Sequence, residues 1–134
     1  MTRRRTAGLL LAVTIPTGIL WRMAPWPYLL WKYGGSILWT VALYLALILL
    51  FPRMRPAAAA LTGAVIALAV ELSRLLHTPA YDAFKASLSG RLLIGRFFSI
   101  YDIAAYWVAL LALFCIDTTV QQRRTRLAHN PSGR

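Results

Sequence analysis

Two carboxylates and one arginine near the middle of the chain have the types and spacing for charge chemistry within a membrane. Glu71 and Arg74 are three residues apart, so a helix places them on one face. Asp102 begins a later apolar run. A carboxylate at bilayer depth costs roughly 3 kcal/mol unless it is protonated or paired. The group is therefore either a polar pocket that meets a headgroup, ion or proton, or an internal salt bridge that locks two helices together.

Two further basic residues follow in the loop 77–99, where Lys85 and Arg91 could fold back onto the carboxylates. Asp102 also has a structural alternative, because Ser99 lies three residues before it and the pair fits the capping-box pattern at a helix start. A capping role and a place in a site do not exclude each other. The candidate functional cluster comprises Glu71, Arg74, Lys85, Arg91 and Asp102.

The spacing of a catalytic or metal site is not found in the sequence. The serines near the cluster have no histidine placed to activate them, and His77 and His129 are isolated from cysteines and from one another. Gly90 and Gly95 bracket four residues without a phosphate-loop lysine, and they are more typical of tight turns or a short re-entrant or interfacial helix. We expect no enzyme, no catalytic residue, no metal and no cofactor.

The elements that must position this cluster are membrane-spanning helices. The chain of 134 residues is 59% hydrophobic and only 14% charged, with a mean hydropathy of +0.59, whereas soluble domains are about 25% charged. Apolar runs of about 20 residues are long enough to cross a bilayer as helices. The fold class predicted is all-α, a polytopic membrane protein with four transmembrane helices in a compact bundle, at about 7–21, 36–51, 57–76 and 100–116. A basic segment 1–6 and a basic tail 118–134 flank this transmembrane domain 7–117.

Small residues recur at helical spacing in the third and fourth runs and predict a packed helix pair. The packing positions are Ala60, Gly63, Ala64 and Ala67 in the third run, and Ala105 and Ala109 in the fourth. Because consecutive spans are antiparallel, Glu71 near the end of one and Asp102 near the start of the next should reach similar depth. The single cysteine, Cys115, is expected to be a small packing residue.

Aromatic residues crowd the segment 21–33 between the first two runs, which is typical of an interfacial belt. A platform that binds sugars or cations is the sharper alternative. The formal net charge of +11 resides in short loops and tails, where it favours contact with anionic lipid headgroups rather than with nucleic acid. Nine of the 15 Lys and Arg residues lie in the termini and the loop 52–56, so both termini are expected to be cytoplasmic.

At these residues the chain resembles domain of unknown function 2809, a family of small four-span bacterial membrane proteins. The matching residues are Gly18 with Arg22, Gly35 with Leu38 and Trp39, Glu71 with Arg74, Gly90 with Gly95, and Asp102 with Tyr106. The family pattern differs at three positions, where this chain has Ser36 for an acid, Arg74 for glutamine and Lys85 for arginine. Arg74 can therefore neutralise Glu71.

More distantly, the arrangement is similar to that of VanZ-type membrane proteins, which are linked with glycopeptide-antibiotic tolerance. These resemblances imply the bacterial cytoplasmic (inner) membrane and a role at the cell envelope. We expect a non-enzymatic, envelope-associated binding or accessory protein with a charged outer-face site between spans three and four. Its partners would be the bilayer, anionic headgroups and a lipid-linked or cell-wall ligand. A second copy of the chain, in a homo-oligomer, is a further candidate partner. The alternatives are a small oligomeric transporter or proton-coupled subunit with Glu71 as protonatable group, and a structural subunit.

Overall fold

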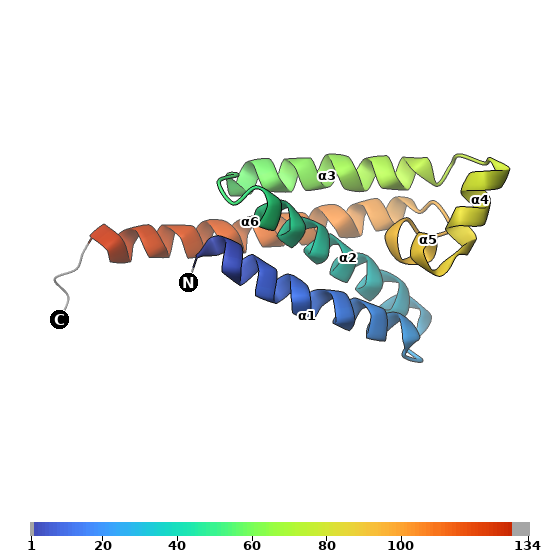
Figure 1. Cartoon of the computed structure of the whole chain (residues 1–134), viewed down its shortest axis with the longest axis horizontal. Coiled ribbons are helices and arrows are strands. Elements are labelled where there is room, and N and C mark those ends of the chain that lie inside the picture. The colour runs from blue at the N-terminus through green and yellow to red at the C-terminus, as the bar shows by residue number, and fades with distance from the viewer. Residues whose placement is uncertain (1, 130–134) are drawn as a thin grey trace.

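A computed structural model describes residues 2–129 and shows six helices in that range (Figure 1). Four are long and apolar enough to cross a membrane. They pack together as an all-α bundle, which confirms the predicted fold class. The long helices are α1 (Arg3–Met23), α2 (Tyr28–Leu50), α3 (Pro56–Ser73) and α6 (Ile100–His129), and two short helices, α4 (Pro79–Ala86) and α5 (Leu88–Leu93), connect α3 to α6.

The first two helices form an antiparallel hairpin. Thr2 caps α1 by accepting a hydrogen bond from the Arg5 amide, and the helix continues through Pro16. α2 begins at Tyr28, directly after Pro27, which is eight residues before the predicted start of this span. The belt segment therefore divides between the turn and the first turns of α2, because the helix begins directly after Pro27 and continues through Gly34 and Gly35 into the apolar run.

The aromatic belt secures this turn. The Trp21 indole donates a hydrogen bond to the Leu30 carbonyl, and the Trp31 indole donates one to the Arg22 carbonyl, each at 3.0 Å. Trp21 also stacks on Trp26 with ring centroids 4.7 Å apart. These indoles hold the α1–α2 turn together.

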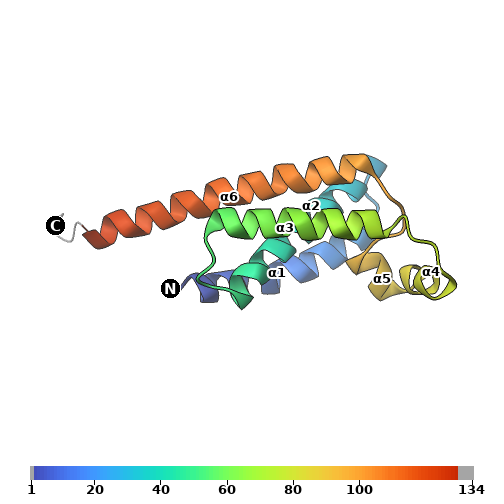
Figure 2. The ribbon, with the colours of Figure 1, turned by 90° about the horizontal axis from the view of Figure 1, so that it is seen from above.

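The third and sixth helices lie side by side in both views (Figure 2). Gly63 and Ala67 of α3 are buried, while Ala60 and Ala64 are half-buried. On α6, Ala109 is buried and Ala105 is half-buried. A side chain at Gly63 would lie within 3.0 Å of Leu110, so the small residue permits the close approach of the two helices.

The last helix extends far past the predicted end of its span. α6 continues to His129, and its final turns project beyond the other helices (Figure 1). Residues 118–129 lack glycine and proline and contain Gln, Arg, Leu and Ala, which favour helix, so nothing in the sequence ends it near 116. The remainder of the predicted tail, 130–134, lies outside the described residues.

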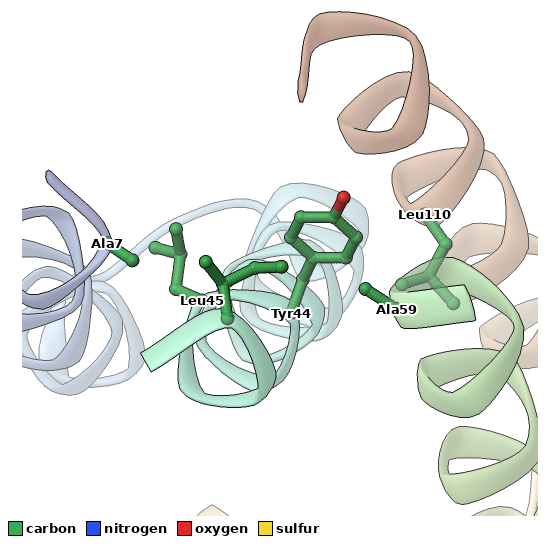
Figure 3. Close-up of a cluster of buried hydrophobic side chains, with 6 residues drawn as sticks. Ala7, Tyr44, Leu45, Ala59 and Leu110 are labelled. Carbon is green, nitrogen blue, oxygen red and sulfur yellow. The ribbon is translucent and has the colours of Figure 1, made fainter. Parts of the chain in front are cut away.

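A small apolar core lies where α1 and α3 begin (Figure 3). Tyr44, Leu45 and Ile48 of α2 pack there with Ala7, Ala59 and Leu110. Most other large apolar side chains are exposed, including Val13, Leu61 and Val108. Burial against neighbouring helices accounts for only 6% of the α1 span. An apolar exterior on helices of this length is that of a membrane protein. Cys115 belongs to this exterior rather than to the packed interior that was expected for it.

Asp117 ties α6 to the start of α1 at this same end. It forms a salt bridge with Arg3, and it accepts a hydrogen bond of 2.8 Å from the Tyr44 hydroxyl. Arg3 also donates to the carbonyls of Pro52 and Met54 in the α2–α3 loop. One arginine therefore connects three parts of the chain.

We expect Asp117→Asn to lower the free energy of unfolding by about 1 kcal/mol, because it removes one charge from a partly exposed pair and keeps the side-chain shape. Thermal unfolding of the purified protein in detergent measures the change. Thr119→Ser, on the exposed side of the same helix, is the control. A variant as stable as the parent would show that this tie contributes nothing.

Candidate functional site

A charged cluster, formed by Glu71, Arg74 and Asp102, lies at the opposite end of the bundle. Arg74 is at its centre: one guanidinium nitrogen, Nη1, lies 2.6 Å from Glu71 Oε2 and 3.3 Å from Asp102 Oδ2. All three residues are buried, and Glu71 has no exposed surface. The antiparallel arrangement of α3 and α6 thus brings the two carboxylates together, as their positions in the sequence predicted.

The same arginine holds the loop between α5 and α6. Its Nε donates to the Ile94 carbonyl and its Nη1 to the Phe97 carbonyl, while Nη2 donates to the Tyr106 hydroxyl at 3.1 Å. Gly95 lies beside the guanidinium with a φ of +84°, a conformation that favours glycine. A side chain at Gly95 would approach Arg74 Nη2 to 2.9 Å.

Glu71 completes this arrangement from α3. Its Oε1 accepts a hydrogen bond of 2.6 Å from the Ser99 amide, and its Oε2 accepts one of 3.3 Å from the Tyr106 hydroxyl. The carboxylate therefore holds the residue that precedes α6 as well as a side chain nearly two turns inside that helix. Each charged group in the cluster is paired with an opposite charge and hydrogen-bonded, which is what burial of such groups requires, although two carboxylates and one guanidinium leave a net charge of −1.

The capping box expected at the start of α6 does not form in the described structure. Glu71 occupies the Ser99 amide that Asp102 would have reached, and the Ser99 hydroxyl accepts a hydrogen bond of 3.2 Å from Lys32 Nζ. Asp102 lies in the first turn of α6, where a negative charge suits the helix dipole. Its carboxylate bonds Arg74 and the Ser36 hydroxyl instead.

Two residues of the predicted cluster lie apart from it. Lys85 is buried in α4, where Nζ lies 2.8 Å from Asp82 Oδ1 and donates to the Leu76 carbonyl at 3.0 Å. This hydrogen bond from Lys85 holds the pKa of Asp82 below its usual range. Arg91 is exposed on α5. The basic residues of the loop therefore fix α4 or face outward, because they belong to the two short helices α4 and α5.

Two residues that the cluster prediction omitted lie at this end. Lys32 and Arg22 come from the α1–α2 turn, and Arg22 is within electrostatic range of Arg74, Asp102 and Tyr106. Arg22 was visible only as part of the family resemblance. The sequence does contain a signal for Arg22, because this residue lies at the end of the first apolar run. In an antiparallel bundle, the end of the first span and the end of the third span lie at the same end of the bundle.

An apolar groove begins next to Arg22; we call it the α1–α2 groove. Its volume is about 670 Å³, within the range of small-molecule sites, roughly 300–1,000 Å³. Matching faces of the hairpin line it, at Leu11, Thr14, Ile15, Gly18, Ile19 and Arg22 on α1 and at Gly35, Leu38, Trp39, Ala42, Leu43 and Ala46 on α2. Helix α5 and Val70 complete it. Of the charged residues that the structure describes, only Arg22 lines the groove.

The fold and this end of the bundle define a small multi-spanning membrane protein with a buried, ion-paired charged cluster beside an apolar groove. Among residues 2–129, no three His, Cys, Asp or Glu side chains gather in a way that could hold a metal ion. The chain belongs to the family described as Protein of unknown function (DUF2809), whose family model matches residues 27–110. The match includes the charged cluster and leaves out α1 with Arg22. No curated protein and no solved structure matches the chain.

Proposed function

We propose that this chain is a non-enzymatic membrane protein of the cell envelope that binds an amphiphile by its apolar chain in the α1–α2 groove. The observation that carries the proposal is the groove itself: about 670 Å³ of apolar space with one charged side chain at one end. Sites for small ligands are typically concave, mostly apolar and supplied with few polar groups. A lipid-linked cell-wall precursor belongs to this chemical class of ligand.

The shape of the groove supports an extended apolar chain. Its α1 face runs from Leu11 to Arg22, which is roughly 16 Å along a helix. This is about half of the 30 Å hydrocarbon thickness of a bilayer, and so about the depth of one leaflet. An acyl or isoprenoid chain inserted from one leaflet would match this length.

In this proposal the charged cluster positions the groove rather than binding the ligand directly. Arg74 holds the carbonyls of Ile94 and Phe97, and Ile94 is also part of the groove lining. The cluster therefore fixes α5 against the hairpin. The sequence predicts that a headgroup binds Glu71 and Asp102. In this proposal the headgroup lies beside these two residues, near Arg22.

We further propose that the protein resides in the bacterial cytoplasmic membrane with both termini in the cytoplasm. α1 begins and α6 ends at the same end of the bundle (Figure 1). The excess of Lys and Arg at that end supports its cytoplasmic location. The groove end with Arg22 then faces the outer leaflet, and no nucleic-acid partner is part of the proposal.

A proton-coupled transporter subunit has less support. Glu71 has no exposed surface and is bonded to Arg74, Ser99 and Tyr106. A carboxylate that exchanges protons with either side of a membrane needs a water-accessible route and freedom to lose its partners. The proposal therefore assigns Glu71 a positioning role.

We expect Ala42→Phe to lower retention of a bound lipid by about tenfold, because the larger side chain fills the groove. Native mass spectrometry of the purified protein, after extensive washing in detergent, measures the fraction that carries a phospholipid adduct. Ala112→Phe, on the exposed side of α6, is the matched control and should retain lipid as the parent does. Thermal unfolding shows whether both variants remain folded.

Equal lipid retention by the folded Ala42→Phe variant and the parent would contradict the proposal. Absence of any retained lipid in the parent would contradict it as well.

A further inference from the structure

We infer that the ligand of the α1–α2 groove is an anionic phospholipid, and that Arg22 selects it by binding the headgroup. The inference rests on the proposed function, since it assigns the chemistry of the headgroup to the ligand whose apolar chain the groove would hold.

Arg22 is a half-buried cation at this end of the bundle. Within the described chain its guanidinium makes no hydrogen bond or salt bridge, although the side chain is half-buried. It lies against Gly35, where an added side chain would come within 3.5 Å of Nε. The guanidinium therefore lies in van der Waals range of the α2 backbone at Gly35.

The balance of charges around Arg22 favours an anion. The cations Arg22, Lys32 and Arg74 face two carboxylates, Glu71 and Asp102. Both carboxylates bond Arg74, and Lys32 bonds the Ser99 hydroxyl. These three cations and two carboxylates carry one net positive charge together, and a ligand with one net negative charge would neutralise it.

The depth of Arg22 matches that of a phospholipid headgroup. The residue is one position from the end of α1. It follows Trp21 in the chain, and its carbonyl accepts a hydrogen bond from Trp31, while Trp26 stacks on Trp21. Such belts mark the headgroup level of a bilayer. A phosphate there can accept a bidentate pair of hydrogen bonds from a guanidinium, while an acyl chain of the same molecule follows the groove toward Leu11.

The test compares phosphatidylglycerol, which carries one net negative charge, with phosphatidylcholine, which carries none. The purified protein is equilibrated in mixed micelles that contain equal amounts of both lipids, and native mass spectrometry measures which lipid is retained. We expect the parent to prefer phosphatidylglycerol by about tenfold and Arg22→Gln to lose this preference while still retaining lipid. Arg91→Gln, an exposed arginine near the same end, should keep the preference.

The outcomes separate this inference from the proposed function. If the parent retains both lipids equally and Ala42→Phe abolishes retention, the groove binds chains and the role of Arg22 is wrong. The same conclusion follows if Arg22→Gln remains folded and keeps the preference. If no lipid is retained, or Ala42→Phe retains it normally, the proposed function itself fails.

Discussion

Arg74→Met should lower the free energy of unfolding by about 3–5 kcal/mol, the largest effect we expect from any single substitution in this chain. Methionine matches the length of the arginine stem but donates no hydrogen bond. The change leaves Glu71 and Asp102 buried without their shared counter-ion, and it releases the carbonyls of Ile94 and Phe97. An uncompensated buried charge is far more unfavourable than a missing pair.

Thermal unfolding in detergent and the amount of folded protein in the membrane both measure this effect. Arg91→Met is the matched control, because Arg91 is exposed on α5, and its effect should stay within about 0.5 kcal/mol. Glu71→Gln should destabilise the parent but have much less effect in the Arg74→Met background, since the two residues are directly coupled. Additive effects would contradict the arrangement of the charged cluster.

Gly95→Ala should destabilise the protein by at least about 2 kcal/mol for two independent reasons. The backbone of Gly95 has a φ of +84°, which an L residue with a side chain rarely adopts. The added methyl group would also approach Arg74 Nη2 to 2.9 Å and displace the guanidinium from its acceptors.

Gly8→Ala is the appropriate comparison, because its added methyl group meets only Leu49 at an ordinary contact distance of 3.5 Å. Within a helix this change should be neutral or slightly stabilising. The same unfolding measurement in detergent applies to both variants. If Gly95→Ala were as stable as Gly8→Ala, the loop after α5 would not depend on the conformation described here.

The four spans could be predicted from the sequence because the length and polarity of a run determine whether a helix can cross a bilayer. The true limits of α2 and α6 could not be predicted in this way. Tyr28 to Gly35 and Thr118 to His129 are helical although they are aromatic or basic, since helix formation continues until a residue interrupts it. Polarity therefore marks the membrane boundary but not the helix boundary, and proline and glycine do not reliably mark it either, since α1 continues through Pro16 and α2 through Gly34 and Gly35.

The core of the charged cluster was also predictable, because antiparallel neighbours bring the end of one helix to the start of the next. Glu71, Arg74 and Asp102 follow from that rule alone. Lys85 and Arg91 do not, since their positions depend on how α4 and α5 fold in the loop. Arg22 and Lys32 required knowledge that the first hairpin packs against the same end of α3 and α6, a contact between distant segments that no local pattern reveals.

The pairing of Glu71 with Arg74, the residue that directly follows α3, bears on how the chain enters its membrane during synthesis. Because the two residues are one turn apart and 2.6 Å from each other, α3 can cross into lipid as an electrically neutral unit before Asp102 has been translated. Asp102 arrives later with a negative charge and meets an end of the bundle where Arg22 and Lys32 already supply positive charge. The order of the charges along the chain thus supplies Glu71 with its counter-ion as α3 is inserted, and supplies Asp102 with cations that are already in place when α6 is inserted.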